Sequence, residues 1–357
     1  MNAAPTTPAP LDVEQLTEYL KAAGLPLDGP LKLSPLTGGQ SNPTFRMQAG
    51  YAQYVLRKKP EGQLLPGAHA VDREYRVIRA LQGTDVPVPK AHVYCDDLSV
   101  IGTPFYVMEW LDGRVFMDQS LPGMTPQERS AIYAEMNRVI AALHAVDPAA
   151  VGLADFGKPG NYFARQITRW SRQCLESTLP MGDAMRRLID WLPEHIPPGD
   201  DTTLVHGDFR LDNLIFHPTE PRAIGVLDWE LSTLGHPLAD FAYHCMSWHI
   251  PASLWRGIAG LELAGTGIPT EREYVEAYAT ATGRQPAEHW DFYMAYNLFR
   301  MAAILRGIGQ RASDGTAAAE DAVETASNAD PLAEIGWECA LQYGRALRFR
   351  SGAAAVP

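Results

Sequence analysis

The spacing of apolar and polar residues predicts a short leading helix followed by a set of strands. Apolar side chains recur at helical spacing from Asp12 to Ala23, with Asp12 as a potential N-cap and Gly24 as a stop. Beyond this helix, short runs of β-prone residues are separated by Gly-Gly and Ala-Gly pairs, as in hairpins. Strands are predicted within 31–36, 44–49 and 51–59, a helix at 71–81, and two more strands within 90–97 and 102–113.

Beyond Gly113 the pattern becomes that of long amphipathic helices. Such helices are predicted at 126–146, 161–177 and 287–311. The Ala-rich, acidic stretch 312–330 is either a helix that packs weakly or a mobile insert, and both chain ends, 1–10 and 351–357, are expected to be loose. The predicted class is α+β, with a flexible N-terminus and leading helix (1–30), a small β-rich N-lobe (31–112) and a larger, mostly helical C-lobe (113–350).

Composition narrows the kind of partner that the chain is expected to bind. Its 357 residues are 46% hydrophobic, enough for a large core, and its formal net charge is -12. An acidic surface is unfavourable for nucleic acid and for anionic membranes, so a small-molecule partner is expected. The four cysteines are far apart, and the sequence has no export signal or long apolar span, which favours a cytoplasmic protein. The oligomeric state stays open.

The stretch "LVHGDFRLDNLIFHP" contains the residues with the clearest chemical pattern. Asp208 and Asn213 are five positions apart, and Asp228 follows within the apolar run "AIGVLDW". A hydroxyl that attacks a γ-phosphoryl group needs a carboxylate for its proton, and the accompanying cations need hard oxygen ligands. Taken alone, Asp208 and Asp212 are more typical of turn residues and Asn213 of a cap, but the combination favours phosphoryl transfer.

Several motifs in one order carry a resemblance to a known family. "GGQSN", "YVLRKKP", "VIGTPFYVMEW", "HGDFRLDNLIFHP" and "LDWELSTLGHPLAD" resemble the aminoglycoside phosphotransferase and choline kinase superfamily. They are most similar to the kinase-like domain fused to certain acyl-CoA dehydrogenases, and to its free-standing bacterial relatives. The resemblance implies a bilobal protein-kinase-like fold that uses ATP and Mg²⁺. It also implies that Asp208 is the catalytic base, that Asn213 and Asp228 are metal ligands, and that His206 and Asp240 support the catalytic loop.

The N-lobe is expected to bind the phosphates of the nucleotide. In the strand "QYVLRKK" the period of two places Arg57 on one face and Lys58 on the other. Kinases usually have Lys at the position of Arg57; we favour Arg57 as the phosphate contact, with Lys58 as the alternative. Glu74 lies on the apolar face of the predicted helix 71–81, where it needs a cationic partner. Arg57 is the natural candidate, and pairing with Arg73 or Arg79 at the surface is the alternative.

Other nucleotide contacts are predicted from the family pattern with less specific signals. The chain has neither GxGxxG nor a Walker motif. Backbone and hydroxyl donors at Gly38, Gly39 and Ser41 are candidates for the phosphates, although a tight hairpin explains these residues equally well. Backbone groups of Glu109 and Leu111, in the segment that joins the two lobes, are candidates for the adenine edge.

The substrate is the least determined part of the prediction. The closer resemblance implies a hydroxyacyl-CoA, particularly a 4-hydroxyacyl-CoA; the alternatives are an aminoglycoside or amino-alcohol acceptor, and a nucleotide-binding pseudokinase. Arg165, Arg169 and Arg172 recur at three- and four-residue spacing on one predicted helix and form a candidate CoA-phosphate patch. Arg300 and Arg306 are further candidates for such contacts. A solvated helix face is the alternative for the patch.

Overall fold

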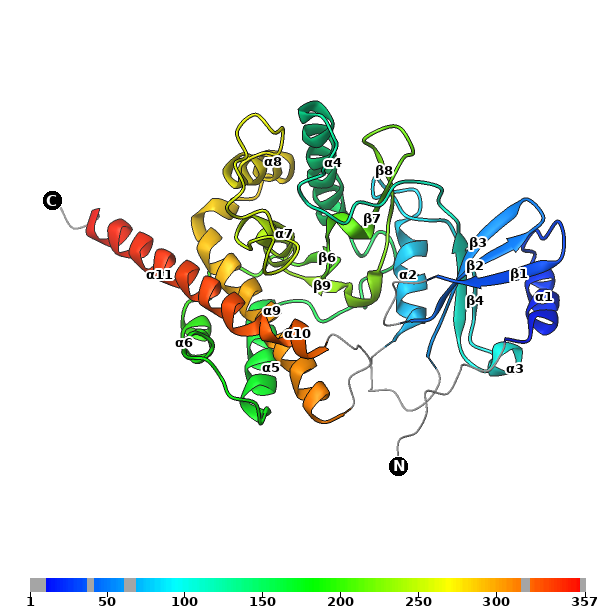
Figure 1. Ribbon diagram of the computed structural model, residues 1–357, viewed down its shortest axis with the longest axis horizontal. Helices are drawn as coiled ribbons and strands as arrows, with labels where there is room; N and C mark the ends of the chain where they lie inside the picture. The colour runs from blue at the N-terminus through cyan, green and yellow to red at the C-terminus, as the bar shows by residue number, and fades with distance from the viewer. Residues whose placement is uncertain (1–10, 37–41, 61–68, 316–321, 354–357) are drawn as a thin grey trace. The chain divides into compact units, whose positions relative to one another are not determined.

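The computed structural model describes residues 11–36, 42–60, 69–315 and 322–353 (Figure 1). The chain divides into two compact units. The smaller comprises Met1–Gln82 and Val88–Asp112, and the larger comprises Gly83–Pro87 and Gly113–Pro357. Among the described residues, no helix has the length and apolar character needed to cross a membrane.

The smaller unit is built on a five-stranded antiparallel sheet with strand order β1-β2-β3-β5-β4. The helices α1 and α3 pack with one face of this sheet, and α2 contacts β4 and β5 (Figure 1). The strands are β1 (Leu31–Pro35), β2 (Thr44–Ala49), β3 (Ala52–Lys58), β4 (Ala91–Cys95) and β5 (Phe105–Glu109), and the helices are α1 (Val13–Ala22), α2 (Val71–Leu81) and α3 (Leu98–Ile101).

The predicted order of strands and helices in this unit is confirmed. Asp12 caps α1 by accepting a hydrogen bond from the backbone of Gln15. The sequence pattern did not predict α3, a single turn capped by Asp97. It also gave no sign that β5 lies between β3 and β4, because pairing between distant strands depends on packing and not on local spacing.

The alternation of β3 decides where its charged side chains lie. Tyr54 and Leu56 point into the apolar core that α1 and α3 share with the sheet. Arg57 therefore lies on the opposite face, toward α2, while the side chain of Lys58 belongs to the core face and is buried. This difference of one position separates the two candidate phosphate contacts.

The larger unit is mostly helical, with two short antiparallel strand pairs, β6–β9 and β7–β8. The long helix α9 packs against α5, α7, α10 and α11 (Figure 1). The helices are α4 (Pro126–Ala145), α5 (Tyr162–Glu176), α6 (Asp183–Trp191), α7 (Pro237–Cys245), α8 (Glu271–Thr282), α9 (Trp290–Ser313), α10 (Ala322–Ser327) and α11 (Ala329–Ala353). The strands are β6 (Thr203–Val205), β7 (Leu214–Phe216), β8 (Ala223–Val226) and β9 (Thr233–Gly235), and short 3₁₀ turns are η1 (Leu192–Glu194), η2 (Leu211–Asn213), η3 (Trp229–Leu231), η4 (Met246–Trp248) and η5 (Pro286–His289).

The predicted long helices are confirmed, but the C-terminal part of the chain differs from the expectation. Of the stretch 312–330, residues 316–321 lie outside the described residues; Ala322–Ser327 form α10, which packs against α9, and α11 begins at Ala329. Residues 351–357 were expected to be loose, yet α11 continues to Ala353; residues 354–357 lie outside the described residues. Once a long helix is nucleated by packing, here against α9 and α6, each added residue extends it at little cost.

Candidate active site

The loop 206–213, predicted to be catalytic and called the catalytic loop below, connects β6 to β7 and takes its shape from a glycine. Gly207 has a φ of 84°, in the left-handed region that only glycine adopts readily. A Cβ at this position would lie 2.7 Å from the carbonyl oxygen of Leu231, closer than real Cβ atoms come to an oxygen. The loop can therefore pass beside η3 only with glycine at this position.

Asp240, in the first turn of α7, holds this loop by its backbone. Its carboxylate accepts hydrogen bonds from the N–H groups of His206 (2.8 Å) and Gly207 (2.7 Å). Nε2 of His144 lies 3.2 Å from the same carboxylate. Burial acts to raise the pKa of Asp240, but the hydrogen bond and charge of His144 and the N–H of His206 hold that pKa below its usual value. Asp240 is thus an ionised anchor with no free oxygen aimed at a reaction.

His206 joins the catalytic loop to the turn that contains Asp228. Its Nδ1 accepts a hydrogen bond from the N–H of Asp208 (3.2 Å), and its Nε2 lies 2.8 Å from the carbonyl oxygen of Leu227. These partners assign the tautomer with the proton on Nε2. The side chain is fully buried and contributes structure, which is the supporting role expected for it.

The carboxylate of Asp208 is held by three side chains. Its Oδ1 accepts a hydrogen bond from the hydroxyl of Tyr243 and lies 3.0 Å from Nε of Arg210. Its Oδ2 accepts a hydrogen bond from the amide nitrogen of Asn213 (3.2 Å). Burial and the charge of Asp208 raise the pKa of Tyr243 far above its usual value. The hydroxyl therefore stays protonated and donates a hydrogen bond to Asp208.

Arg210 connects Asp208 to a second carboxylate. Its Nη1 lies 3.3 Å from Asp212, which also pairs with Arg256. Burial acts to lower the pKa of Arg210, but the neighbouring Asp208 raises it overall, so the guanidinium stays charged. A further arginine, Arg300 of α9, is buried and donates a hydrogen bond to the carbonyl oxygen of Gly207 (2.9 Å). The loop is therefore fixed from α7, from α9 and from within itself.

Asn213 and Asp228 form a fitting donor set for a divalent cation. The amide nitrogen of Asn213 also donates to the carbonyl oxygen of Asp208 (2.8 Å), which leaves the amide oxygen as the group that can bind a cation. The N–H of Leu227 donates to the carbonyl oxygen of Asn213 (2.8 Å), so the β7–β8 pairing brings the two turns together. Asp228 itself has a left-handed backbone, with φ of 64°. No group of three or more His, Cys, Asp or Glu side chains suited to a metal occurs among the described residues, so a cation bound here would need other ligands as well.

In the smaller unit, Glu74 gathers three partners around its buried carboxylate. Nε of Arg57 lies 3.0 Å from Oε2, the predicted ion pair. The hydroxyl of Tyr106 donates to the same oxygen (3.0 Å), and the amide of Asn42 donates to Oε1 (2.7 Å). Glu74 is 1% exposed, so each of these contacts operates away from bulk water. The result is a guanidinium with one fixed edge.

The other predicted nucleotide contacts form two groups, of which the structure describes one. Gly38, Gly39 and Ser41 lie outside the described residues. The N–H of Glu109 donates to the carbonyl oxygen of Lys90 (2.8 Å), so Glu109 can offer adenine only its carbonyl group. The N–H of Leu111 has no hydrogen-bond partner within the described part of the chain.

Comparison with known proteins identifies the family. Residues 32–296 match the phosphotransferase enzyme family, abbreviated APH. The chain belongs to this family. Mouse acyl-CoA dehydrogenase family member 10 is 46% identical over 334 residues, which are 93% of this chain and 31% of the mouse protein, so the chain spans only part of this relative. A crystal structure of a Ralstonia eutropha protein, described as a candidate aminoglycoside phosphotransferase, is 54% identical with a TM-score of 0.87, and covers 93% of this chain and 99% of that one.

More distant structures share the fold of this phosphotransferase. Aminoglycoside phosphotransferase APH(4)-Ia, solved as a ternary complex with AMP-PNP and hygromycin B, has a TM-score of 0.60 at 16% identity and covers 91% of this chain and 98% of that one. The predicted family and the α+β, kinase-like fold are confirmed.

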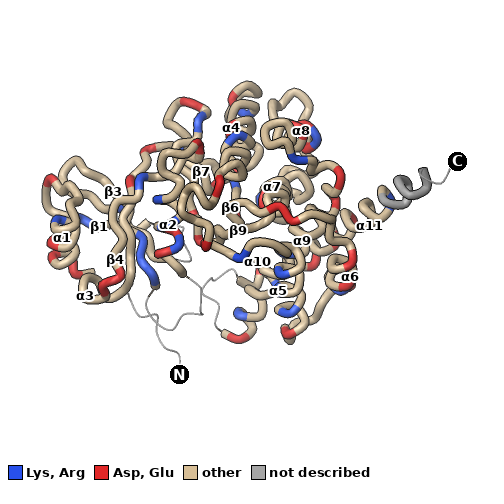
Figure 2. Tube along the Cα trace, turned by 180° about the vertical axis from the view of Figure 1, so that it is seen from behind, with Lys and Arg blue, Asp and Glu red and all other residues tan. Residues whose placement is uncertain are grey.

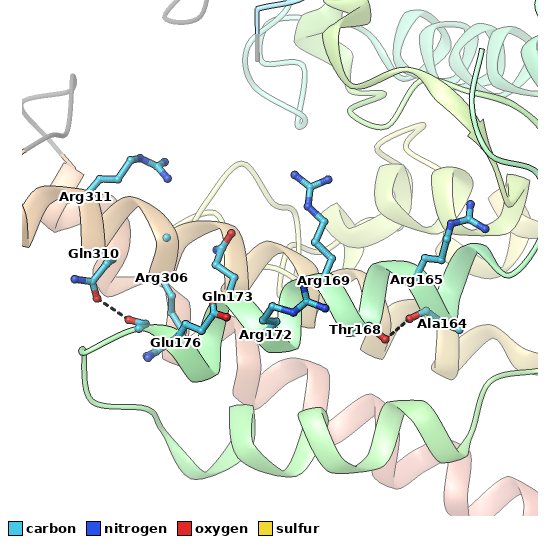
Figure 3. A pocket seen from close by; sticks show the side chains of 12 residues that line it. Ala164, Arg165, Thr168, Arg169, Arg172, Gln173, Glu176, Arg306, Gln310 and Arg311 are labelled. Carbon is cyan, nitrogen blue, oxygen red and sulfur yellow. Dashed lines mark hydrogen bonds between the residues drawn. The ribbon is translucent and has the colours of Figure 1, made fainter. Parts of the chain in front are cut away.

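The predicted basic patch of this phosphotransferase lies in a groove between α5 and α9 (Figure 3). The groove has a volume of about 800 Å³, and none of its lining residues belongs to the catalytic loop. Arg165, Arg169 and Arg172 of α5 line it together with Arg306 and Arg311 of α9. Arg300 does not join them, because it is buried against Gly207 and the ring of Tyr243.

Several residues that shape the active site were not predicted. Arg210 is two positions after Asp208, so its proximity could have been found from spacing. Tyr243 reaches Asp208 across 35 residues, and its contact depends on how α7 packs beside the loop. Asn42, Tyr106 and His144 reach their partners across 32 residues or more, and no local pattern marks them.

Proposed function

We propose that this phosphotransferase transfers the γ-phosphoryl group of ATP to the hydroxyl group of a small molecule. The arrangement around Asp208 carries the proposal: a carboxylate whose direction is fixed by Tyr243, Arg210 and Asn213. In the reaction the acceptor oxygen forms a bond to the γ-phosphorus, the bond from that phosphorus to the bridging oxygen of ADP breaks, and Asp208 accepts the proton of the hydroxyl. Fixing the carboxylate beforehand lowers the entropic cost of reaching the transition state.

Asn213 and Asp228 are the residues that would hold Mg²⁺, one through an amide oxygen and one through a carboxylate. When bound, the cation neutralises charge on the phosphate oxygens. The protein's own contribution is to aim the two oxygens: the Asn213 amide is oriented by Asp208, and the turn that holds Asp228 is tied to His206 through Leu227.

Arg57 is the proposed phosphate contact of the smaller unit. The ion pair between its Nε and Glu74 restrains the side chain, so a contact with phosphate would cost little further side-chain entropy. The carbonyl group of Glu109 and the N–H of Leu111 are the proposed adenine contacts, and Gly38, Gly39 and Ser41 stay predicted phosphate donors.

For the acceptor we propose a hydroxyacyl-CoA, in particular a 4-hydroxyacyl-CoA. Support comes from the mouse relative, an acyl-CoA dehydrogenase family member with 46% identity over nearly the whole of this chain. An aminoglycoside is the second candidate, because the Ralstonia eutropha protein is described by that activity. The two differ in charge: an aminoglycoside is a cation, whereas CoA carries several phosphates, and the arginine-lined groove of the larger unit favours the anion.

A direct assay distinguishes these acceptors. The purified protein is given MgATP with 3- and 4-hydroxyacyl-CoAs, the free hydroxy acids, aminoglycosides or choline, and both ADP and phosphorylated product are measured. We expect turnover with a hydroxyacyl-CoA, and its loss in Asp208→Ala. Turnover confined to aminoglycosides would show that the acceptor is an aminoglycoside and not a hydroxyacyl-CoA. If MgATP binds but no hydroxyl compound is phosphorylated, the chain acts as a pseudokinase and the proposal is wrong.

A further inference from the structure

We propose that the α5–α9 groove binds the phosphate groups of the nucleotide half of a CoA thioester; this inference rests on the hydroxyacyl-CoA acceptor proposed above. Five arginines and one glutamate, Glu176, are its charged lining residues, in a protein whose net charge is -12. Such a concentration of positive charge offsets the long-range repulsion that a polyanionic ligand meets at an acidic protein.

The arginines of α5 lie close together on one face of the helix. Arg165, Arg169 and Arg172 follow one another at intervals of four and three residues, so they lie on one side of the helix, where like charges repel. Among the described residues none of the three pairs with a carboxylate. Figure 3 shows Arg165 and Arg169 of α5 and Arg311 of α9 extending to the same side of the two helices. An anion bound among them relieves the repulsion.

The floor of the groove is fixed, so the site is built and not only charged. Arg306 is buried and donates to the carbonyl oxygens of Pro180 (2.6 Å) and Leu179 (3.1 Å). The amide of Gln173 donates to the carbonyl oxygen of Ala303 (2.9 Å) and ties α5 to α9. A Cβ at Gly307 would lie 2.6 Å from that amide, so glycine is what lets the two helices approach here.

The rim arginines are suited to phosphate. Arg169 and Arg172 are exposed, and the guanidinium of Arg169 lies 4.8 Å from the ring centre of Trp170, which restricts its motion. Guanidinium groups bind two phosphate oxygens at once through charge-assisted hydrogen bonds. Lys and Arg positions along α5 and the neighbouring part of α9 are visible as blue segments in Figure 2.

The groove and the catalytic loop belong to the same unit and are connected by α9. Arg300 of this helix contacts Gly207, directly before Asp208, and Arg306 follows six residues later. At 1.5 Å per residue this is about 9 Å along the helix axis. A ligand that uses both places needs its phosphates well separated from its reactive hydroxyl. A CoA thioester has this form, because a long pantetheine arm separates its nucleotide from its acyl chain.

The first experiment measures binding in the groove without any reaction. Adenosine 3′,5′-bisphosphate, which carries phosphates of CoA but no acyl arm, is titrated by calorimetry into the full chain saturated with AMP-PNP, so that a nucleotide site is already filled. We expect binding that weakens about tenfold in the double variant Arg169→Ala, Arg172→Ala, the loss typical of charge-assisted hydrogen bonds. Arg272→Ala on α8, whose side chain is 83% exposed, is the matched control and keeps the wild-type affinity.

The second experiment separates this inference from the proposed function. With a 4-hydroxyacyl-CoA the double variant is expected to raise KM about tenfold at unchanged kcat, and with the matching hydroxyacyl-pantetheine, which lacks the nucleotide, it has no effect. Turnover of the CoA thioester with the same KM in wild type and variant overturns the groove site and leaves the kinase standing. If the wild type binds the bisphosphate, the variant does not, and no CoA thioester is turned over, the anion site is supported and the proposed hydroxyacyl-CoA acceptor is wrong. No bisphosphate binding in the wild type overturns the inference.

Discussion

The catalytic loop and the α5–α9 groove, both in the larger unit, use arginine in opposite ways. Around Asp208 the arginines are satisfied inside the protein: Arg210 pairs with Asp208 and Asp212, and Arg300 donates to Gly207. In the groove, Arg169 and Arg172 are exposed and pair with no carboxylate of the described chain. Internal pairing fixes a geometry before substrate arrives, whereas arginines without an internal carboxylate supply binding energy only when an anion arrives.

Asp208→Ala, in the catalytic loop, is expected to have the largest effect. Loss of a positioned base should lower kcat by about 10² to 10⁴-fold, because it acts on the transition state. Affinity for MgATP should change little. Steady-state kinetics and calorimetry on the folded variant measure both, with the groove variant Arg172→Ala as the comparison. Near-normal turnover of Asp208→Ala contradicts the assignment.

Acidification should destabilise the helical unit through its buried histidines. Burial lowers the pKa of His236 and of His244 to about 4, and lowers that of His144 as well. The unfolded chain binds these protons near pH 6.5, so stability that is fully present above that pH is lost as pH falls toward 4. His236 and His244 should each contribute about 1.4 kcal/mol per pH unit in this window.

Urea unfolding at pH 7, 6 and 5 tests this dependence. His244→Asn should make the pH slope shallower, because it removes one of the buried histidines whose pKa is lowered. A free energy of unfolding that is equal at pH 7 and pH 5 contradicts the prediction.

Gly207→Ala should show how tightly the loop is packed. The left-handed backbone alone costs about 1 to 2 kcal/mol for a residue with a Cβ, and contact with Leu231 adds to it. Gly283→Ala is the matched control, because Gly283 has a φ of 70° but a Cβ added there would meet nothing within 4 Å. The difference between their unfolding free energies isolates the steric part. If the two variants are destabilised equally, the loop relaxes around the added methyl group and the contact with Leu231 has no steric cost.

Asp228→Ala should weaken Mg²⁺-dependent ATP binding by at least about tenfold, since a carboxylate is the main charged ligand of a hard cation. Calorimetry with ATP in the presence and absence of Mg²⁺ measures this change. Equal MgATP affinity in the variant and the wild type shows that Asp228 is not a ligand.

The smallest expected effect concerns salt. Exposed charges are screened within about 8 Å at physiological ionic strength, whereas buried pairs are screened far less. Raising the salt concentration should therefore increase KM for a hydroxyacyl-CoA a few-fold while kcat, which depends on the buried loop, stays constant. Steady-state kinetics at low and moderate salt measure both constants. A fall in kcat at constant KM would show that the loop, and not the groove, is the salt-sensitive region.

The sequence predicted best where function depends on local spacing. The Asp208–Asn213 interval and the positions of Arg57 and Glu74 on facing surfaces follow from loop and strand periodicity, and the ion pair between Arg57 and Glu74 is present. The contacts of Arg300 and Tyr243 could not be predicted in the same way, because they depend on how α9 and α7 pack beside the loop. The strand order and the long helix α11 were not predicted, for the same reason.

His206 imposes a constraint on anyone who wishes to move this loop to another protein. Its ring is a rigid spacer that accepts a hydrogen bond at Nδ1 and donates one at Nε2. The amide side chains of Asn and Gln differ from it in reach and geometry. A graft that carries only the letters from His206 to Asn213 loses the carbonyl of Leu227 and the carboxylate of Asp240. The transferable module is therefore discontinuous: it needs both strand pairs and the first turn of α7.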